Sequence, residues 1–203
     1  MPDWDANSPE LLRNLLEVGR KVAVAAIARD SLSSEVIRAW QNDIMQGLEP
    51  AQGEPFGAFR GEPGLEIYDV EIDRHSGTRT ELVHAELAEF DHTLAQQLEE
   101  LDRSIRRGHF AEDCTADNIN AVIILCAWAH GEWVRIHPFP NGNGRSARIL
   151  VNGIALRYGL PAFMRMRPRP GPEYVWAAIQ AMQRNWEAAI PLFQRMYRAA
   201  LSS

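Results

Sequence analysis

Hydrophobic residues recur three and four positions apart along most of this chain, and that spacing predicts a mainly helical protein. Two helices are expected between residues 8 and 47. The first has a capping serine at Ser8, and the second begins at Ser33 or Ser34. Because glycine commonly follows the last helical turn, Gly47 predicts where the second helix stops.

The middle of the chain predicts the longest helices. Glu86–Arg107 has a leucine-rich face and a charged face, which is typical of an amphipathic helix. A helix from about Asn118 to Arg135 is apolar on every side over Ala121–Ala129, so we expect it to be the buried core helix. The next helix ends at Tyr158-Gly159. Two more helices are expected at the C-terminal end: Glu173–Arg184 and Glu187–Leu201.

One stretch of the chain favours strands instead. Alternating apolar residues in Leu65–Asp73, a turn at His75–Thr78 and a second run at Thr80–His84 predict a short β-hairpin. The fold class is therefore all-α with one hairpin, arranged as a single domain over residues 1–203. Its parts are N-terminal helices (8–47), a loop and hairpin (48–85), core helices and motif (86–160) and C-terminal helices (173–201).

Composition narrows the possible partners. The net charge of −6 argues against nucleic acid or an anionic membrane as the main partner. No apolar run is long enough to span a bilayer, and the polar N-terminus lacks the features of a secretion signal. The two cysteines, Cys114 and Cys126, have no metal-ligand spacing and make no disulfide framework. We expect a cytoplasmic protein without nucleic-acid or membrane partners.

The segment from His137 to Arg148 carries the chemistry. It reads His-Pro-Phe-Pro-Asn-Gly-Asn-Gly-Arg-Ser-Ala-Arg, so the prolines make a stiff, extended corner before a glycine-rich turn. A helix follows this turn. The first N–H groups of a helix have no internal acceptor and lie at the positive end of its dipole, so the turn predicts an anion cradle. Arg145 and Arg148 are three residues apart on one helix face and reach the same space.

This segment resembles the signature of the Fic/Doc family, HPF-x-[D/E]-GNGR-xx-R. Eight of its nine specified positions match, and Asn141 stands where the family has a carboxylate. The resemblance implies transfer of AMP from ATP to a Ser, Thr or Tyr hydroxyl of a target protein. His137 would be the general base. The nucleotide would be held by the N–H groups of Gly142, Asn143 and Gly144 and by the side chains of Arg145 and Arg148.

Asn141 is the one departure from the signature. The family carboxylate holds the Mg²⁺ that accompanies ATP, whereas asparagine offers only a neutral oxygen. Three outcomes stay open: the amide oxygen suffices as a weak ligand, another acidic residue binds the metal, or the protein is weakly active or uses a different phosphorylated donor. A further alternative is a non-catalytic module that binds nucleotide or peptide in the same groove.

Two more segments resemble family elements. Gly57-Ala-Phe-Arg60 is similar to an element that precedes the flap, a hairpin that holds the target by strand pairing. The flap residues would be Ile67, Tyr68, Asp69 and Val70.

Ser31–Val36 partly resembles the family's inhibitory helix, with Glu35 as the inhibitory residue. An N-cap serine followed by a first-turn glutamate explains the same residues. Any inhibitor is therefore expected to be absent or to be a separate antitoxin-like protein.

Overall fold

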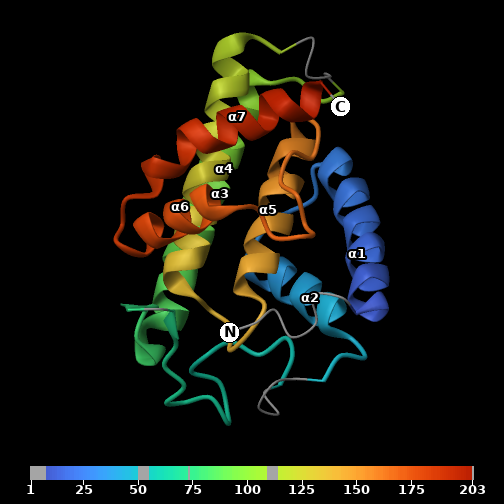
Figure 1. Cartoon of the computed structure of the whole chain (residues 1–203). Coiled ribbons are helices and arrows are strands. Elements are labelled where there is room, and N and C mark those ends of the chain that lie inside the picture. The colour runs from blue at the N-terminus through green and yellow to red at the C-terminus, as the bar shows by residue number, and fades with distance from the viewer. Residues whose placement is uncertain (1–7, 50–54, 73, 109–113, 203) are drawn as a thin grey trace.

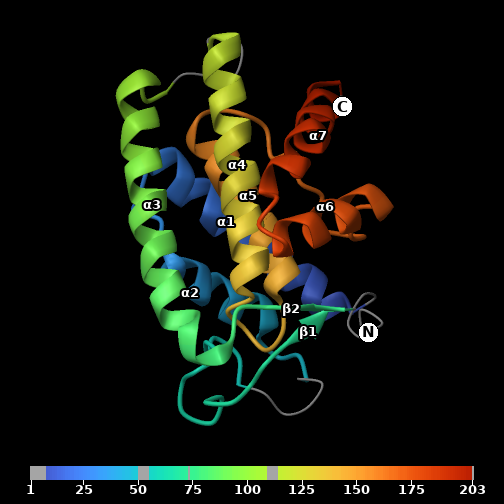
Figure 2. The same cartoon turned by 90° about the vertical axis from the view of Figure 1, so that its left-hand side faces the viewer.

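The computed structural model describes residues 8–49, 55–72, 74–108 and 114–202. Two helices, α4 (Ala116–Ile136) and α5 (Asn143–Arg157), run side by side through the middle of the molecule (Figure 1). On one side, α5 packs against α1 (Pro9–Ala28) and α2 (Ser34–Met45). The other helices cover α4. The loop that joins α4 to α5 lies at one end of the central pair (Figures 1 and 2).

The helices that cover α4 come from two parts of the chain. One is α3 (Val83–Ser104), which follows the 3₁₀ turn η1 (Thr80–Leu82). The others are α6 (Pro172–Met182) and α7 (Ile190–Leu201), with the 3₁₀ turn η3 (Trp186–Ala189) between them. A helix starting at Glu187 was predicted, but the α-helix starts three residues later. Proline, which has no N–H, occupies the first turn of α7, where no intrahelical donor is needed.

Several helix starts follow directly from the sequence. The side chains of Ser8, Ser33 and Thr115 each accept a hydrogen bond from the amide three residues ahead, at 3.3, 3.4 and 3.1 Å respectively. Each is thus an N-cap for the helix it precedes. The capping serines predicted for the first two helices are confirmed.

The core lies between the helices and includes the apolar positions predicted for the third and fourth of them. Leu87, Phe90, Leu94 and Leu98 of α3 are buried, and most of α4 is buried on all sides. On α1 only one face is covered, since Leu12 and Leu16 are exposed. The expected all-α fold with one hairpin is confirmed. Among the described residues, no helix is both long and apolar enough to cross a membrane.

The hairpin is much shorter than the sequence predicts. It consists of β1 (Glu71–Ile72) and β2 (His75–Ser76), which pair antiparallel (Figure 2). Leu65–Val70 forms turns, and the strand expected at Thr80–His84 is wrong because this segment opens η1 and α3. The Asp69 carboxylate accepts hydrogen bonds from the Thr80 N–H at 2.9 Å and from its hydroxyl at 2.7 Å. This contact satisfies a free N–H at the helical start and therefore favours helix over strand.

Candidate active site

His137 is the residue at which α4 ends. Its amide still donates to the Trp133 carbonyl at 3.0 Å, but its backbone is left-handed, with φ 53° and ψ 56°. Pro138 cannot continue the hydrogen-bonding pattern, so the chain turns out of the helix here. An extended corner was expected at His137, and the left-handed conformation corrects that expectation. Such a conformation is strained for a residue with a Cβ and must be held by its surroundings.

The imidazole of His137 is oriented by a backbone contact. Its Nδ1 lies 3.1 Å from the Val134 carbonyl oxygen. A carbonyl oxygen can only accept, so Nδ1 carries the proton and the neutral ring has its lone pair on Nε2. The side chain is half-buried, and the loss of water around the ring lowers the pKa of His137 to about 4. A smaller effect of the Arg60 charge acts in the same direction. His137 is therefore a neutral proton acceptor at neutral pH.

The loop after His137 is tied together by the side chain of Asn143. Its amide oxygen accepts from the Phe139 N–H at 2.9 Å, and its amide nitrogen donates to the Phe139 carbonyl at 2.7 Å. The Phe139 ring is fully buried and stacks on Phe59, so it anchors the loop in the core. These contacts bring the start of α5 back beside the end of α4.

The turn into α5 matches the expected cradle in part. Gly142 adopts φ 86°, a conformation that favours glycine, and α5 begins at the next residue. The amides of Asn143 and Gly144 therefore open the helix, where geometry leaves N–H groups without an intrahelical acceptor. The Gly142 N–H is used differently, because it donates to the Asn141 side-chain oxygen at 2.6 Å. Of the three amides expected to bind an anion, those of Asn143 and Gly144 are therefore left for this role.

Asn141 also bears on the expected metal site. Its side-chain oxygen already accepts from Gly142, and its carbonyl accepts from the Gln41 side chain at 3.0 Å. No group of three or more His, Cys, Asp and Glu side chains lies close enough together to hold a metal ion in the described part of the chain. Mg²⁺ in proteins is usually bound by one or two carboxylates together with substrate phosphates, and Asn141 offers no carboxylate at this position.

The two arginines of the segment are both buried, and Arg148 folds back over the start of its own helix. A Cβ added at Gly144 would lie 3.4 Å from Nη1 of Arg148. The Arg148 guanidinium also lies 5.9 Å from the centre of the Tyr174 ring and donates to the Met166 carbonyl at 3.4 Å. A positive charge is thereby placed beside the amide of Gly144.

Tyr174 connects Arg148 to a second histidine. Its hydroxyl lies 2.8 Å from Nε2 of His130 inside the core. Burial, and to a lesser extent the charge of Arg148, lowers the pKa of His130 to about 3. This contact gives His130 a structural, hydrogen-bonding role in the core.

The predicted flap residues lie just before β1. Ile67 is 95% exposed, and the carbonyls of Tyr68 and Val70 accept hydrogen bonds from Arg60 and Gly77 respectively. Asp69 caps Thr80, as described above. These residues therefore form a turn-rich segment with one exposed apolar side chain, attached to the rest of the site through Arg60.

Glu35 occupies the first turn of α2. Its carboxylate pairs with Arg38 at 3.4 Å and its side chain is 66% exposed, while Ser33 caps the helix. The capping interpretation of this stretch is confirmed, and Arg38 rather than Arg148 is the described partner of Glu35.

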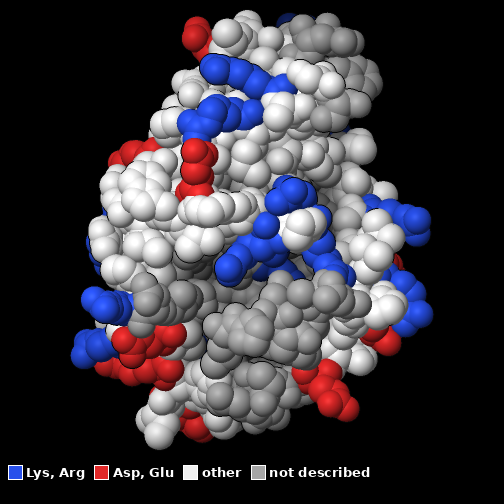
Figure 3. All heavy atoms as spheres, in the orientation of Figure 1, with Lys and Arg blue, Asp and Glu red and all other residues white. Residues whose placement is uncertain are grey.

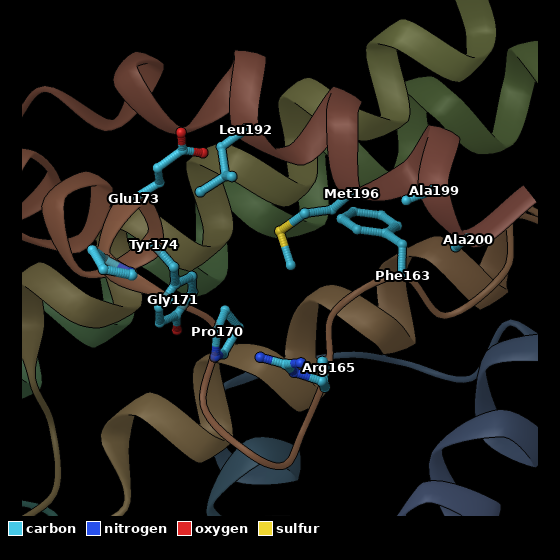
Figure 4. A pocket seen from close by; sticks show the side chains of 11 residues that line it. Phe163, Arg165, Pro170, Gly171, Glu173, Tyr174, Leu192, Met196, Ala199 and Ala200 are labelled. Atoms are coloured by element: carbon cyan, nitrogen blue, oxygen red, sulfur yellow. The ribbon is translucent and has the colours of Figure 1, made fainter. Parts of the chain in front are cut away.

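Other surface features lie close to the site. Lys and Arg side chains gather near the middle of the face in Figure 3, over the segment that joins α5 to α6. A pocket of about 690 Å³ lies between that segment, α6 and α7 (Figure 4). Arg165 and Glu173 contribute charged groups to its lining, and Phe163 and Met196 contribute apolar ones. None of the sequence-predicted site residues lines this pocket.

Sequence reasoning missed several residues that shape the site. Gln41 bridges the Asn141 carbonyl and the Gly57 amide, Tyr174 contacts Arg148, and Gly77 packs against His137. Nothing in their spacing indicated these contacts. Arg60 was noticed as part of a family element, but its contacts could not be inferred.

Comparison with known proteins agrees with this geometry. The profile of the Fic/DOC family matches residues 31–155. Short segments match the "Protein adenylyltransferase Fic" of Nematostella vectensis (51% identity over 39 residues, 19% of this chain and 9% of that one) and the "Protein adenylyltransferase fic-1" of Caenorhabditis elegans (54% over 35 residues, 17% and 7%). The chain thus aligns with less than a tenth of the length of these relatives.

A solved structure supports the fold. The Fic domain containing signaling protein from Bacteroides thetaiotaomicron superposes with a TM-score of 0.61 at 18% identity, over 96% of this chain and 73% of that one. At this level of identity the likeness concerns the fold alone. The family profile covers more than half of the sequence, including the whole segment from His137 to Arg148, and the chain belongs to the Fic/DOC family.

Proposed function

We propose that this protein transfers AMP from ATP to a hydroxyl side chain of a target protein. The observation that supports this most is the orientation of His137. Its Nδ1–H is held by the Val134 carbonyl, so the Nε2 lone pair is left to accept a proton. Short segments of the chain also match proteins that are named protein adenylyltransferases, and that name describes the same reaction.

In the proposed step, Nε2 of His137 takes the proton of a Ser, Thr or Tyr hydroxyl. The hydroxyl oxygen forms a bond to the α-phosphorus of ATP. The bond from that phosphorus to the oxygen bridging to the β-phosphate breaks, and pyrophosphate leaves with the bonding electrons. Because the pKa of His137 is about 4, nearly all of the base is neutral and ready to accept the proton at neutral pH.

The phosphates would be held at the start of α5. Backbone N–H groups of Asn143 and Gly144 lie at the positive end of the helix, where they stabilise charge that grows on a phosphate oxygen. Arg148, beside Gly144, and Arg145 in the same turn would bind the β- and γ-phosphates. Mg²⁺ would enter with ATP as a counter-ion of its phosphates, and Asn141 would give it no carboxylate ligand.

The target would approach along the segment before β1. Strands as short as β1 and β2 leave backbone groups unpaired at the edge, and an extended peptide can bind to them. The exposed Ile67 offers such a peptide an apolar contact. Inhibition by a separate antitoxin-like protein remains part of this proposal.

A second candidate is a binding module that holds nucleotide without transferring it. Asn141 favours it, because its oxygen is bound to Gly142 and no carboxylate replaces the family's metal ligand at this position. Such a protein would retain the amides and arginines of the cradle and would bind ATP, but it would not consume it.

Incubation with labelled ATP separates the two candidates. The purified protein is incubated with ATP labelled at the α- or the γ-phosphate, with and without a soluble cell extract as a source of acceptor proteins. We expect α-label, and not γ-label, to become covalently attached to protein. His137→Ala should reduce this attachment by about 10²–10⁴-fold while ATP binding persists. Binding of ATP without covalent label under any of these conditions would favour the binding module.

A further inference from the structure

Arg60 is a fully buried arginine that contacts the backbone on both sides of His137. Its Nη2 donates to the Ile136 carbonyl at 2.8 Å, and its Nε donates to the His137 carbonyl at 2.7 Å. The amide of Arg60 itself donates to the Pro138 carbonyl at 2.8 Å. One residue thus binds three consecutive carbonyls at the point where the chain takes its left-handed turn.

The same guanidinium also binds the flap segment. Its Nη1 donates to the Tyr68 carbonyl at 3.2 Å and to the Thr80 hydroxyl at 3.3 Å, and its Nη2 donates to the Thr78 carbonyl at 2.6 Å. Asp69, 3.7 Å away, is an ion-pair partner, but its side chain is 70% exposed. The fork of the guanidinium therefore joins two segments that are far apart in sequence.

Gly77 brings these two segments into direct contact. A Cβ at this position would lie 2.9 Å from the Cβ of His137 and 3.3 Å from Nη2 of Arg60. The closer distance is shorter than van der Waals contact allows, so any side chain at Gly77 would have to displace the histidine or the flap. The return limb of the hairpin is thus packed directly on the catalytic candidate.

We propose that Arg60 is a positioning residue for the transfer reaction: it holds the His137 backbone in its left-handed turn and fixes the target-binding flap to it as one unit. This rests on the function proposed above. The guanidinium is suited to the task because its planar, five-donor fork can reach several carbonyls at once. Burying a charged group is costly unless its polar atoms are hydrogen-bonded. The N–H groups of the Arg60 guanidinium donate to the His137 turn and to the flap rather than to a buried carboxylate.

Two substitutions separate the charge of Arg60 from its geometry. Arg60→Gln removes the charge and most of the donors. Arg60→Lys keeps the charge, but its single ammonium cannot bridge both segments. In the transfer assay with α-labelled ATP we expect kcat to fall by about 10–100-fold in Arg60→Gln, because misplacement of a catalytic group by about 1 Å has that effect. KM for ATP should not change. Arg60→Lys should also lose kcat.

The pKa of His137 gives a readout that does not depend on activity. NMR titration of the histidine rings, with the His137 signal identified by its absence from His137→Ala, should give a raised pKa in Arg60→Gln. The reason is that the Arg60 charge lowers the pKa of His137 in the native protein. In Arg60→Lys the pKa should stay low while kcat falls.

Arg157→Gln is the matched control. Arg157 is largely covered, with 9% of its side chain exposed, and it binds the Asp102 carboxylate with two donors at 2.6 and 3.3 Å. It lies at the far end of α5 from the loop. This variant should lose thermal stability without changing kcat or the pKa of His137. Should Arg60→Gln fail to fold, Gly77→Ala tests the same contact from the flap, and kcat should again fall at constant KM for ATP.

The outcomes are distinct. If Arg60→Gln or Gly77→Ala loses activity only in proportion to its unfolded fraction, or raises KM for ATP at constant kcat, Arg60 does not position His137. If the native protein transfers no label, the proposed function is refuted, but the NMR titration still tests whether Arg60 positions His137. An unchanged His137 signal and pKa in Arg60→Gln would overturn the proposal, and a raised pKa with a shifted signal would support it.

Discussion

The pH dependence of transfer is a direct test of the environment of His137. With a pKa of about 4, this histidine stays about 97% neutral when the pH falls from 7.5 to 5.5. A histidine with the ordinary value of 6.5 would retain only about a tenth of its neutral form over the same interval. We therefore expect kcat/KM for ATP, which reports the free enzyme, to be nearly flat between these pH values.

Stability should behave in the opposite way. His130 and His137 have pKa values of about 3 and about 4 in the folded protein, lower than the 6.5 expected when unfolded. As the pH falls below 6.5, the unfolded chain binds protons that the folded protein does not, so the free energy of unfolding decreases. Between pH 7.5 and 5.5, each histidine lowers the free energy of unfolding by about 1.3 kcal/mol, and the two together lower it by about 2–3 kcal/mol. The two histidines leave the free energy of unfolding undiminished only above about pH 6.5.

The assay combines both measurements on the same samples. Initial rates of α-label transfer are recorded at each pH, with the ionisation of ATP determined separately on the free nucleotide, and unfolding is followed by denaturant titration. In His137→Ala the pH-dependent loss of stability should be about halved. A tenfold fall in kcat/KM by pH 5.5, measured while the protein is still folded, would show that the surroundings of His137 do not lower its pKa.

Three further predictions concern the phosphates, the metal and the target. Arg148→Ala should weaken ATP binding by about 1.5–3 kcal/mol and AMP binding much less; equal losses in calorimetry would place Arg148 away from the distal phosphates. Asn141→Asp should lower the Mg²⁺ concentration needed for transfer and weaken ATP binding without metal; a magnesium titration identical to that of the native protein would contradict this. Val70→Pro, compared with Val70→Ala, should reduce target labelling and leave ATP binding intact; unchanged labelling would exclude strand pairing at this position.

Helices and their caps were predictable because their determinants are local. Ser8, Ser33 and Thr115 each bond to an amide three residues away, and the apolar positions of α3 lie on one face whatever surrounds the helix. The segment around His137 was recognisable for a similar reason. Its glycines and prolines specify a turn by their own backbone preferences.

The hairpin shows where local reasoning ends. The apolar spacing of Leu65–Ile72 fits a strand, yet Leu65 is buried and Ile67 is almost fully exposed. The segment is held instead by the contact of Asp69 with Thr80, eleven residues away, at the start of the helical path to α3. The His137 carbonyl, in its left-handed turn, likewise accepts a hydrogen bond from the side chain of Arg60, 77 residues earlier. Periodicity carries no information about either contact.

The structure also explains why Asn141 can replace the family's carboxylate without disturbing the loop. The contact that its side chain makes is a hydrogen bond accepted from the Gly142 N–H, and an aspartate oxygen could accept the same bond. The loop is otherwise held by Asn143, Gln41 and the buried Phe139, which are indifferent to the charge at position 141. The difference between the two residues is therefore electrostatic rather than structural. If the start of α5 binds the phosphates of ATP as proposed, the asparagine should alter the metal dependence of this site and leave its geometry as it is.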